Sequence, residues 1–208
     1  ASLADGKLTL GGEYNFKRKS SIELIVGIPV TRTHSFDFDG NESDLDTKAF
    51  SILAGYRYYF GRRGLRGLYI EPYAKYLHHE GSGILEGSLS GETARFDTRS
   101  DYKGVGLGAQ LGVQFLIAKG VAIDLFLLGP EANSAEFSLT GTDIASNIPW
   151  TLVKANEAEQ DIRDALDDIP IIGDKVKVEV NQNTKTIRTS YNGFLPGFRF
   201  GASVGFRF

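Results

Sequence analysis

The feature that most constrains this chain is a two-residue alternation of apolar and polar side chains. A β-strand turns successive side chains to opposite faces, so this alternation predicts strands with two unlike faces. The predicted strands are residues 7–17, 21–30, 50–60, 68–76, 104–117, 121–128 and 197–208. We therefore expect an all-β chain that forms a single domain over residues 1–208.

Charge is confined to one face of these strands. The apolar faces carry no Asp, Glu, Lys, Arg or His. The opposite faces carry Lys7, Glu13, Glu23, Arg57, Glu71, Lys75, Asp124, Arg199 and Arg207. The charged faces are also rich in glycine, which weakens a solvent-facing strand but fits the crowded interior of a narrow barrel. We therefore expect the charged face to point inward and the apolar face to contact lipid.

Aromatic side chains gather at the strand ends. Those next to the short connections form a predicted aromatic girdle of Tyr14, Phe16, Tyr58, Phe60, Phe115, Phe206 and Phe208. Short connections (17–20, 61–67 and 118–120) alternate with long ones (31–49, 77–103 and 129–196). Outer-membrane barrels have this asymmetry, with short periplasmic turns and interfacial aromatic girdles. The pattern predicts a closed antiparallel transmembrane β-barrel in a bacterial outer membrane, with a periplasmic C-terminus; a soluble lipocalin-like barrel is the alternative.

The strand count predicts that one strand lies outside this sequence. Closed bacterial barrels have an even number of strands and at least eight. With seven alternating strands and a periplasmic C-terminus, we expect an eighth strand upstream of Ala1. The rival is an eighth strand within 175–191, but both faces of that segment are charged.

Inward charges are expected to form an interior polar cluster. Its predicted members are Glu13, Glu23, Arg57, Glu71, Lys75, Asp124, Arg199 and Arg207. An eight-stranded barrel is just wide enough for its own side chains, and unpaired buried charges are costly. We predict that these acids and bases pair as a salt-bridged plug; a polar channel is the alternative.

Residues 131–192 are expected to form an extracellular loop insertion. A helix is predicted at about 156–168, since Asn156 and Glu159 resemble a capping box and Pro170 ends the apolar stripe. Trp150 is expected to anchor this helix. A hairpin is predicted at about 175–190, above the membrane.

Two polar segments carry residue types that can bind metal ions. The first long connection holds a possible cation loop of Asp37, Asp39, Glu42, Asp44 and Asp46. Glu42 stands where an EF-hand needs glycine, so a solvated acidic loop is expected. His78 and His79 are adjacent and point to opposite faces of a strand, which disfavours one shared metal. No metal or cofactor is predicted.

Composition excludes several classes. The chain has 0 Cys, which excludes disulfides and Cys-ligated zinc, and its pI of about 5.7 disfavours nucleic-acid binding. The sequence contains no stretch of 18 apolar residues, so no transmembrane helix is expected. The short turns are basic, which favours contact with anionic lipid headgroups.

Several segments resemble a known family. EYNFKRKSSIEL, GYRYYF, GLYIEPYAKY, IPIIGDKVKVEV and FLPGFRFGASVGFRF together resemble an uncharacterised family of Bacteroidota outer-membrane β-barrel proteins, a domain of unknown function among OmpA/OmpW-like small barrels. The resemblance implies an eight-stranded barrel exported through a cleaved signal peptide. It implies no substrate and no site residues.

From these observations we expect a non-enzymatic barrel that is an accessory subunit or a surface-interaction protein of an outer-membrane complex. Expected partners are outer-membrane lipid and lipopolysaccharide, other outer-membrane proteins, and the barrel-insertion machinery, which reads an aromatic C-terminal strand such as GFRF. The alternatives are a passive conduit for small apolar molecules and a lipid-modifying enzyme.

Overall fold

The computed structural model describes residues 6–38, 41–62, 64–89, 92–117, 120–145, 150–167 and 175–206. These ranges contain one helix, α1 (Leu152–Asp167). Their strands are β1 (Lys7–Lys17), β2 (Ser20–Pro29), β3 (Arg32–Phe38), β4 (Asn41–Tyr59), β5 (Gly67–Leu89), β6 (Glu92–Ile117), β7 (Val121–Asp143), β8 (Lys177–Asn181) and β9 (Thr186–Phe206). The prediction of an antiparallel all-β chain with one helix is confirmed.

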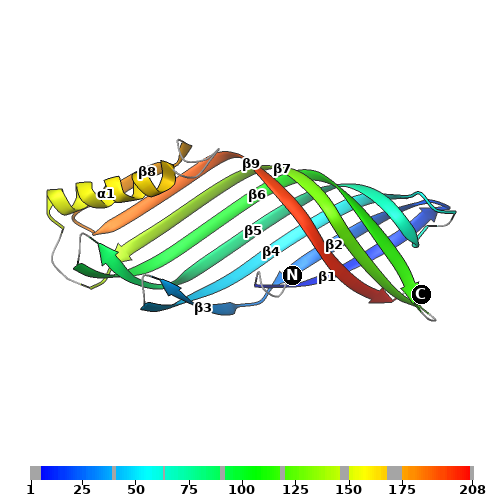
Figure 1. Ribbon diagram of the computed structural model, residues 1–208, viewed down its shortest axis with the longest axis horizontal. Helices are drawn as coiled ribbons and strands as arrows, with labels where there is room; N and C mark the ends of the chain where they lie inside the picture. The colour runs from blue at the N-terminus through cyan, green and yellow to red at the C-terminus, as the bar shows by residue number, and fades with distance from the viewer. Residues whose placement is uncertain are drawn as a thin grey trace.

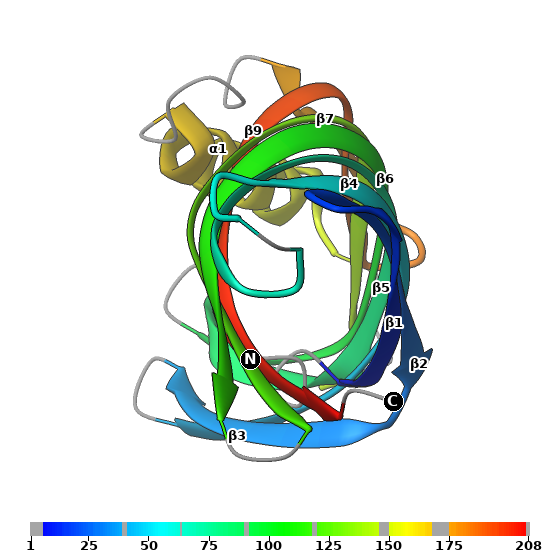
Figure 2. The ribbon, with the colours of Figure 1, turned by 90° about the vertical axis from the view of Figure 1, so that its right-hand side faces the viewer.

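One sheet contains all the strands. Its order is β1-β2-β4-β5-β6-β7-β9-β8, and β3 pairs with the distal part of β4. The strands run obliquely along the molecule, with α1 and β8 at the end opposite the short turns (Figure 1). Viewed along its length, the sheet curls round so that one face becomes concave (Figure 2).

The predicted closed barrel is not shown. Six successive antiparallel pairings lead from β1 to β9, so these two strands run in the same direction. An antiparallel ladder cannot form directly between them. Among the described residues the sheet therefore has two free edges. One runs along β1, and the other runs along residues 191–206 of β9, beyond the residues that pair with β8.

The strands extend far into the connections that were predicted to be long. β5 and β6 pair without interruption from Gly67↔Gln114 to Leu89↔Glu92. β7 extends to Asp143, where its predicted end was residue 128, and β3 and β4 form a hairpin within 31–49. Both faces of these extensions carry polar side chains, so the two-residue alternation that marks a half-apolar strand fades there although the ladder continues.

The helix α1 begins four residues before the predicted position. Thr151 Oγ1 accepts a hydrogen bond from the backbone N–H of Lys154 at 3.2 Å, so Thr151 rather than Asn156 is the N-terminal cap. Ala155 and Ala158 are buried with Trp150, against Phe96 and two residues of the β8–β9 hairpin. Among the described residues, no helix is both long and apolar enough to cross a membrane.

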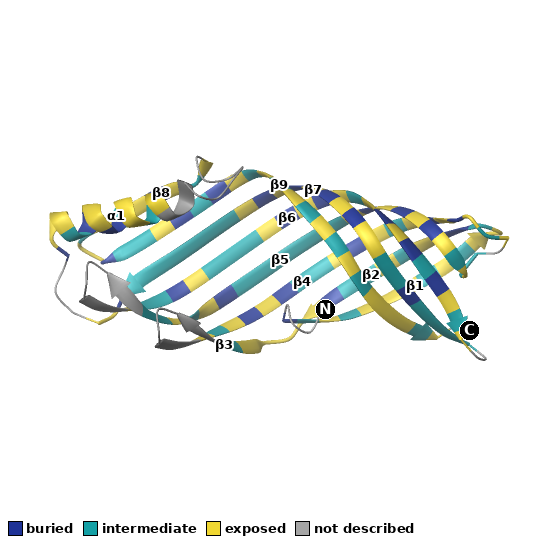
Figure 3. Cartoon of the chain, viewed as in Figure 1, coloured by how far each residue is buried: buried dark blue, intermediate teal, exposed yellow. Residues whose placement is uncertain are grey.

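Burial alternates along the strands, but with reversed polarity (Figure 3). Arg57, Glu71, Gln110 and Asp124 are buried on the concave face. Large apolar side chains are exposed on the convex face, as in Leu107, which is 66% exposed. The sheet thus buries its charges and exposes its hydrophobic residues, the reverse of an ordinary soluble core.

Candidate functional site

An arginine at the centre of the concave face collects four carboxylates. Arg57, from β4, is 2% exposed and contacts acids from four other strands. Its guanidinium nitrogens lie 3.0 Å from Glu13 Oε2, 2.8 Å from Glu23 Oε1, 2.7 Å from Glu71 Oε2 and 2.8 Å from Asp124 Oδ2. We call these five residues the interior cluster. Each comes from a different strand, so the cluster links β1, β2, β4, β5 and β7 across the curled sheet.

The interior cluster is not charge-balanced. Four carboxylates surround one guanidinium, and Glu71 Oε1 and Glu23 Oε2 are buried without a hydrogen-bond partner. Asp124 Oδ2 lies 2.8 Å from the Arg57 guanidinium, within ionic distance. The predicted acids do pair with a base, but a single residue, Arg57, contacts all four of them.

Neutral side chains donate further hydrogen bonds to three of these acids, Glu13, Glu71 and Asp124. Tyr59 donates its hydroxyl to Glu13 Oε1 at 2.6 Å, and Tyr69 donates to Asp124 Oδ1 at 2.9 Å. The Arg57 guanidinium also lies 4.4 Å from the centre of the Tyr69 ring, within cation–π range. Further donors are Ser21 to Glu13, Gln110 to Glu71 and Gln114 to Glu13. Both tyrosines are buried, and neither was among the residues predicted for the interior polar cluster.

A second group of interior contacts lies beside the first. Lys75 pairs with Glu131, to which Tyr73 also donates its hydroxyl at 2.9 Å. Arg199 donates to Gln110 Oε1 at 2.8 Å and stacks on Phe126 at 4.4 Å. Lys75 and Arg199 therefore point inward as members of this second group, whereas the predicted Arg207 lies outside the described residues.

Glu131 is the interior acid that sequence reasoning missed. The register of β7 shifts against both neighbours between Phe126 and Gly129, so Leu127 and Leu128 are both exposed. This bulge changes the parity of β7, and residues with odd numbers point inward beyond it. Two consecutive leucines in an otherwise alternating strand were the available sequence signal.

Interior glycines have a steric cause. A Cβ on Gly112 would lie 2.3 Å from the Tyr69 ring, and one on Gly55 would lie 2.0 Å from Glu71 Oε1. The hydroxyls and carboxylates of the interior can pack only because the adjacent strand presents no side chain.

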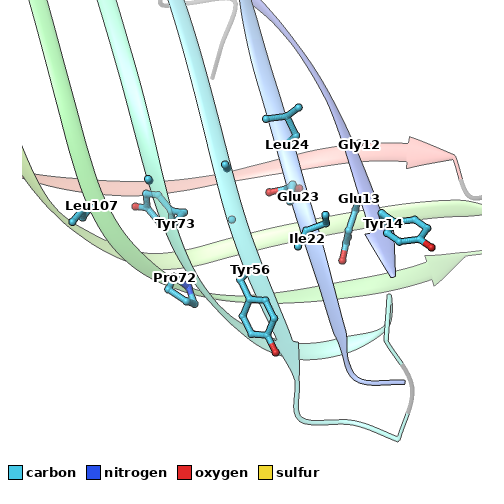
Figure 4. Close-up of a pocket in the computed structure, with 13 residues that line it drawn as sticks. Gly12, Glu13, Tyr14, Ile22, Glu23, Leu24, Tyr56, Pro72, Tyr73 and Leu107 are labelled. Carbon is cyan, nitrogen blue, oxygen red and sulfur yellow. The ribbon is translucent and has the colours of Figure 1, made fainter. Parts of the chain in front are cut away.

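The predicted aromatic girdle lies on the convex face near the short turns. Its six described members are all exposed, and Tyr58 and Phe60 pack edge to face with 5.8 Å between ring centres. Phe208 lies outside the described residues. Nearby, a hollow of about 870 Å³ is lined by small residues such as Gly12, Ala54 and Ala74 (Figure 4). Tyr14, Tyr56 and Leu107 border it.

The acidic segment falls in the β3–β4 hairpin. Asp46 accepts a hydrogen bond from Thr33 at 2.6 Å, and Asp44 accepts one from Ser35 at 2.6 Å. These two hydrogen bonds link β3 to β4 across the hairpin. Asp39 and the side chains of Asp37 and Glu42 lie outside what the structure describes, so the segment is not assembled into a site here.

The concave face is filled and cross-linked by its own side chains. Buried ionic and hydrogen-bonded side chains connect most of the strands, and the two most buried charged side chains, Arg57 and Glu71, contact one another. No family model, curated protein or solved structure matched the chain in our comparisons.

Proposed function

We propose that this chain is an outer-membrane β-barrel protein without enzymatic activity, acting as an accessory subunit or surface-interaction protein of an outer-membrane complex. The observation that carries the proposal is the reversed polarity of the sheet. Leu10, Leu24, Leu107 and Val204 are each more than half exposed on the convex face, while the concave face buries an ionic network. Water would penalise such a surface at about 25 cal/mol per Å² of apolar area, whereas a lipid environment favours it.

The free edges fit a barrel completed by one further strand. Because β1 and β9 run in the same direction, an odd number of strands must separate them in an antiparallel barrel. One such strand gives eight, the smallest closed number in bacterial outer membranes. We place that strand before β1, and we propose membership of the Bacteroidota barrel family on the motifs quoted above.

The membrane proposal has a direct test. Leu107→Arg should destabilise the protein in lipid by about 2–4 kcal/mol, the cost of an arginine near mid-bilayer. The matched control is Leu152→Arg, because Leu152 is equally exposed (66%) but lies on α1. Equilibrium unfolding in urea from lipid vesicles would measure the free energy of unfolding of both variants. Equal stability of the two variants, or a wild-type protein that stays soluble and monodisperse without detergent, would contradict the proposal.

The subunit role rests on the distal end of the molecule. There α1 leaves Leu152 and Val153 each 66% exposed, beyond the sheet that carries the ionic interior. A stoichiometric partner in mild detergent extracts, crosslinked to residues of α1, is the expected result. A solitary monomer in native membranes would contradict the subunit role.

Unchanged lipid A in a deletion strain is expected for a protein that is not a lipid-modifying enzyme.

A conduit for small apolar molecules is the second candidate, favoured by the hollow beside Ala54 and Ala74. The interior cluster opposes it, since Glu71 fills the space next to Gly55. Uptake of an apolar dye into vesicles carrying the protein would support the conduit and exclude the plug.

A further inference from the structure

Three metal-ligating side chains meet on the convex face just beyond the apolar band. His78 and Glu80 are two residues apart on β5, so they share a face, and Asp101 of β6 stands directly opposite Glu80. Their ligand atoms all lie within 4.8 Å of one another. The adjacent His78 and His79 point to opposite faces of β5 and cannot share one ion. The productive neighbours are instead Glu80, at the i+2 position, and Asp101, across the ladder.

The spacing of the three atoms suits a small tetrahedral ion. His78 Nε2 lies 2.9 Å from Asp101 Oδ2 and 3.7 Å from Glu80 Oε1. Ligands held about 2.0–2.1 Å from a tetrahedral zinc ion are separated by roughly 3.4 Å. The two His78 separations bracket that value, and all three ligand atoms lie within 4.8 Å of one another, so the group is close to the spacing of a tetrahedral zinc site.

Two lysines hold the carboxylates in place. Lys48 Nζ contacts Glu80 Oε2 at 2.8 Å, and Lys103 Nζ contacts Asp101 Oδ1 at 3.1 Å. Each lysine takes one carboxylate oxygen and leaves the other directed toward His78. Outer-shell contacts of this kind orient metal ligands.

We propose that His78, Glu80 and Asp101 form a zinc-class divalent metal site on the outer wall of the sheet. One imidazole nitrogen and two carboxylate oxygens fill three positions of a tetrahedron and leave the fourth open. The side chains are 27%, 42% and 38% exposed, so the ion and its fourth ligand have access from outside. The flanking lysines favour an anionic oxygen ligand at that position, such as water-derived hydroxide or a phosphate.

The test is zinc titration of the purified, untagged full chain in detergent. We expect one zinc ion per chain by calorimetry, and a cobalt(II) derivative with the visible absorption of tetrahedral coordination. Calcium, which prefers six to eight oxygen ligands, should not compete at equal concentration. His78→Gln and Asp101→Asn should each weaken zinc binding at least about tenfold, given that even outer-shell losses reach 10–100-fold.

The adjacent histidine provides a matched control. The chain has 3 histidines, and His79→Gln removes one that points to the other face of β5. His79→Gln should bind zinc like the wild type. The proposal is overturned if the wild type binds no zinc, if His78→Gln binds normally, or if His79→Gln alone abolishes binding. Because the three ligands are partly exposed, thermal unfolding should show all variants folded alike; His34→Gln serves as a second control.

Discussion

Arg57 is the residue whose loss should cost the most stability. Arg57→Met keeps a long flexible side chain but removes the one cation that contacts Glu13, Glu23, Glu71 and Asp124. Removing one partner of a buried ion pair costs about 3–5 kcal/mol, because the other charge stays buried without compensation. Here four carboxylates lose their shared partner, so we expect at least about 4 kcal/mol, roughly a thousandfold in the unfolding equilibrium.

The assay is equilibrium unfolding in urea from lipid vesicles, followed by far-UV circular dichroism and by the heat-dependent shift in gel mobility. Arg99→Met is the matched control, because the Arg99 side chain is 76% exposed and its closest acid, Asp97, lies 3.6 Å away. The control should change stability by no more than about 0.5 kcal/mol. Should Arg57→Met fail to fold, Arg57→Lys gives a graded loss, since three ammonium donors replace a five-donor fork.

A rescue experiment separates electrostatics from packing. Adding Glu23→Gln and Glu71→Gln to Arg57→Met removes two uncompensated charges while keeping the side-chain volumes. The triple variant should recover much of the lost stability. The reasoning is refuted if Arg57→Met unfolds at the same urea concentration as Arg99→Met, or if the glutamine substitutions lower stability further.

Two further predictions concern packing. Gly112→Ala should destabilise the protein by about 1–3 kcal/mol, because its Cβ would meet the Tyr69 ring at 2.3 Å; Gly12→Ala, with no atom within 4 Å of its Cβ, should be neutral in the same urea titration. Trp150→Phe should remove the hydrogen bond from Trp150 Nε1 to Asp143 Oδ2 (2.9 Å) and loosen α1. Faster amide hydrogen exchange in 152–167 than in the rest of the chain would show this, and uniform exchange would contradict it.

The seven strands that cross the apolar band were predictable because each has one wholly apolar face. That signal depends on a contrast between faces, so it faded where β5, β6 and β7 continue with polar side chains on both sides. The alternation of side chains therefore could not predict where β5, β6 and β7 end. Their backbone hydrogen bonds continue all the same, because a ladder does not require one apolar and one polar face. The bulge at Leu127 and Leu128 also changed the parity of β7, which concealed Glu131.

Parity predicted which side chains point inward but not which of them meet. Glu13 and Glu23 are directly opposite across β1 and β2, yet both contact Arg57, which comes from β4. The contact with Glu23 joins the adjacent strands β2 and β4, whereas the contact of Arg57 with Asp124 of β7 spans two intervening strands. The longer contacts depend on the curl of the sheet, which no local pattern encodes. The group of His78, Glu80 and Asp101 is also not encoded in a local pattern. It depends on the register between β5 and β6, which places Glu80 opposite Asp101.

The unbroken β5–β6 ladder makes the distal end of the molecule a spacer of fixed length. The thirteen steps from Tyr76 to Leu89, at about 3.4 Å each, amount to about 44 Å of paired strand. Because the two strands are paired along this segment, its length is fixed by the number of residues, unlike the end-to-end distance of a flexible linker. Its length can therefore be changed in steps by deleting residues. Deleting two residues from each strand would shorten it by about 7 Å while every remaining side chain kept its face.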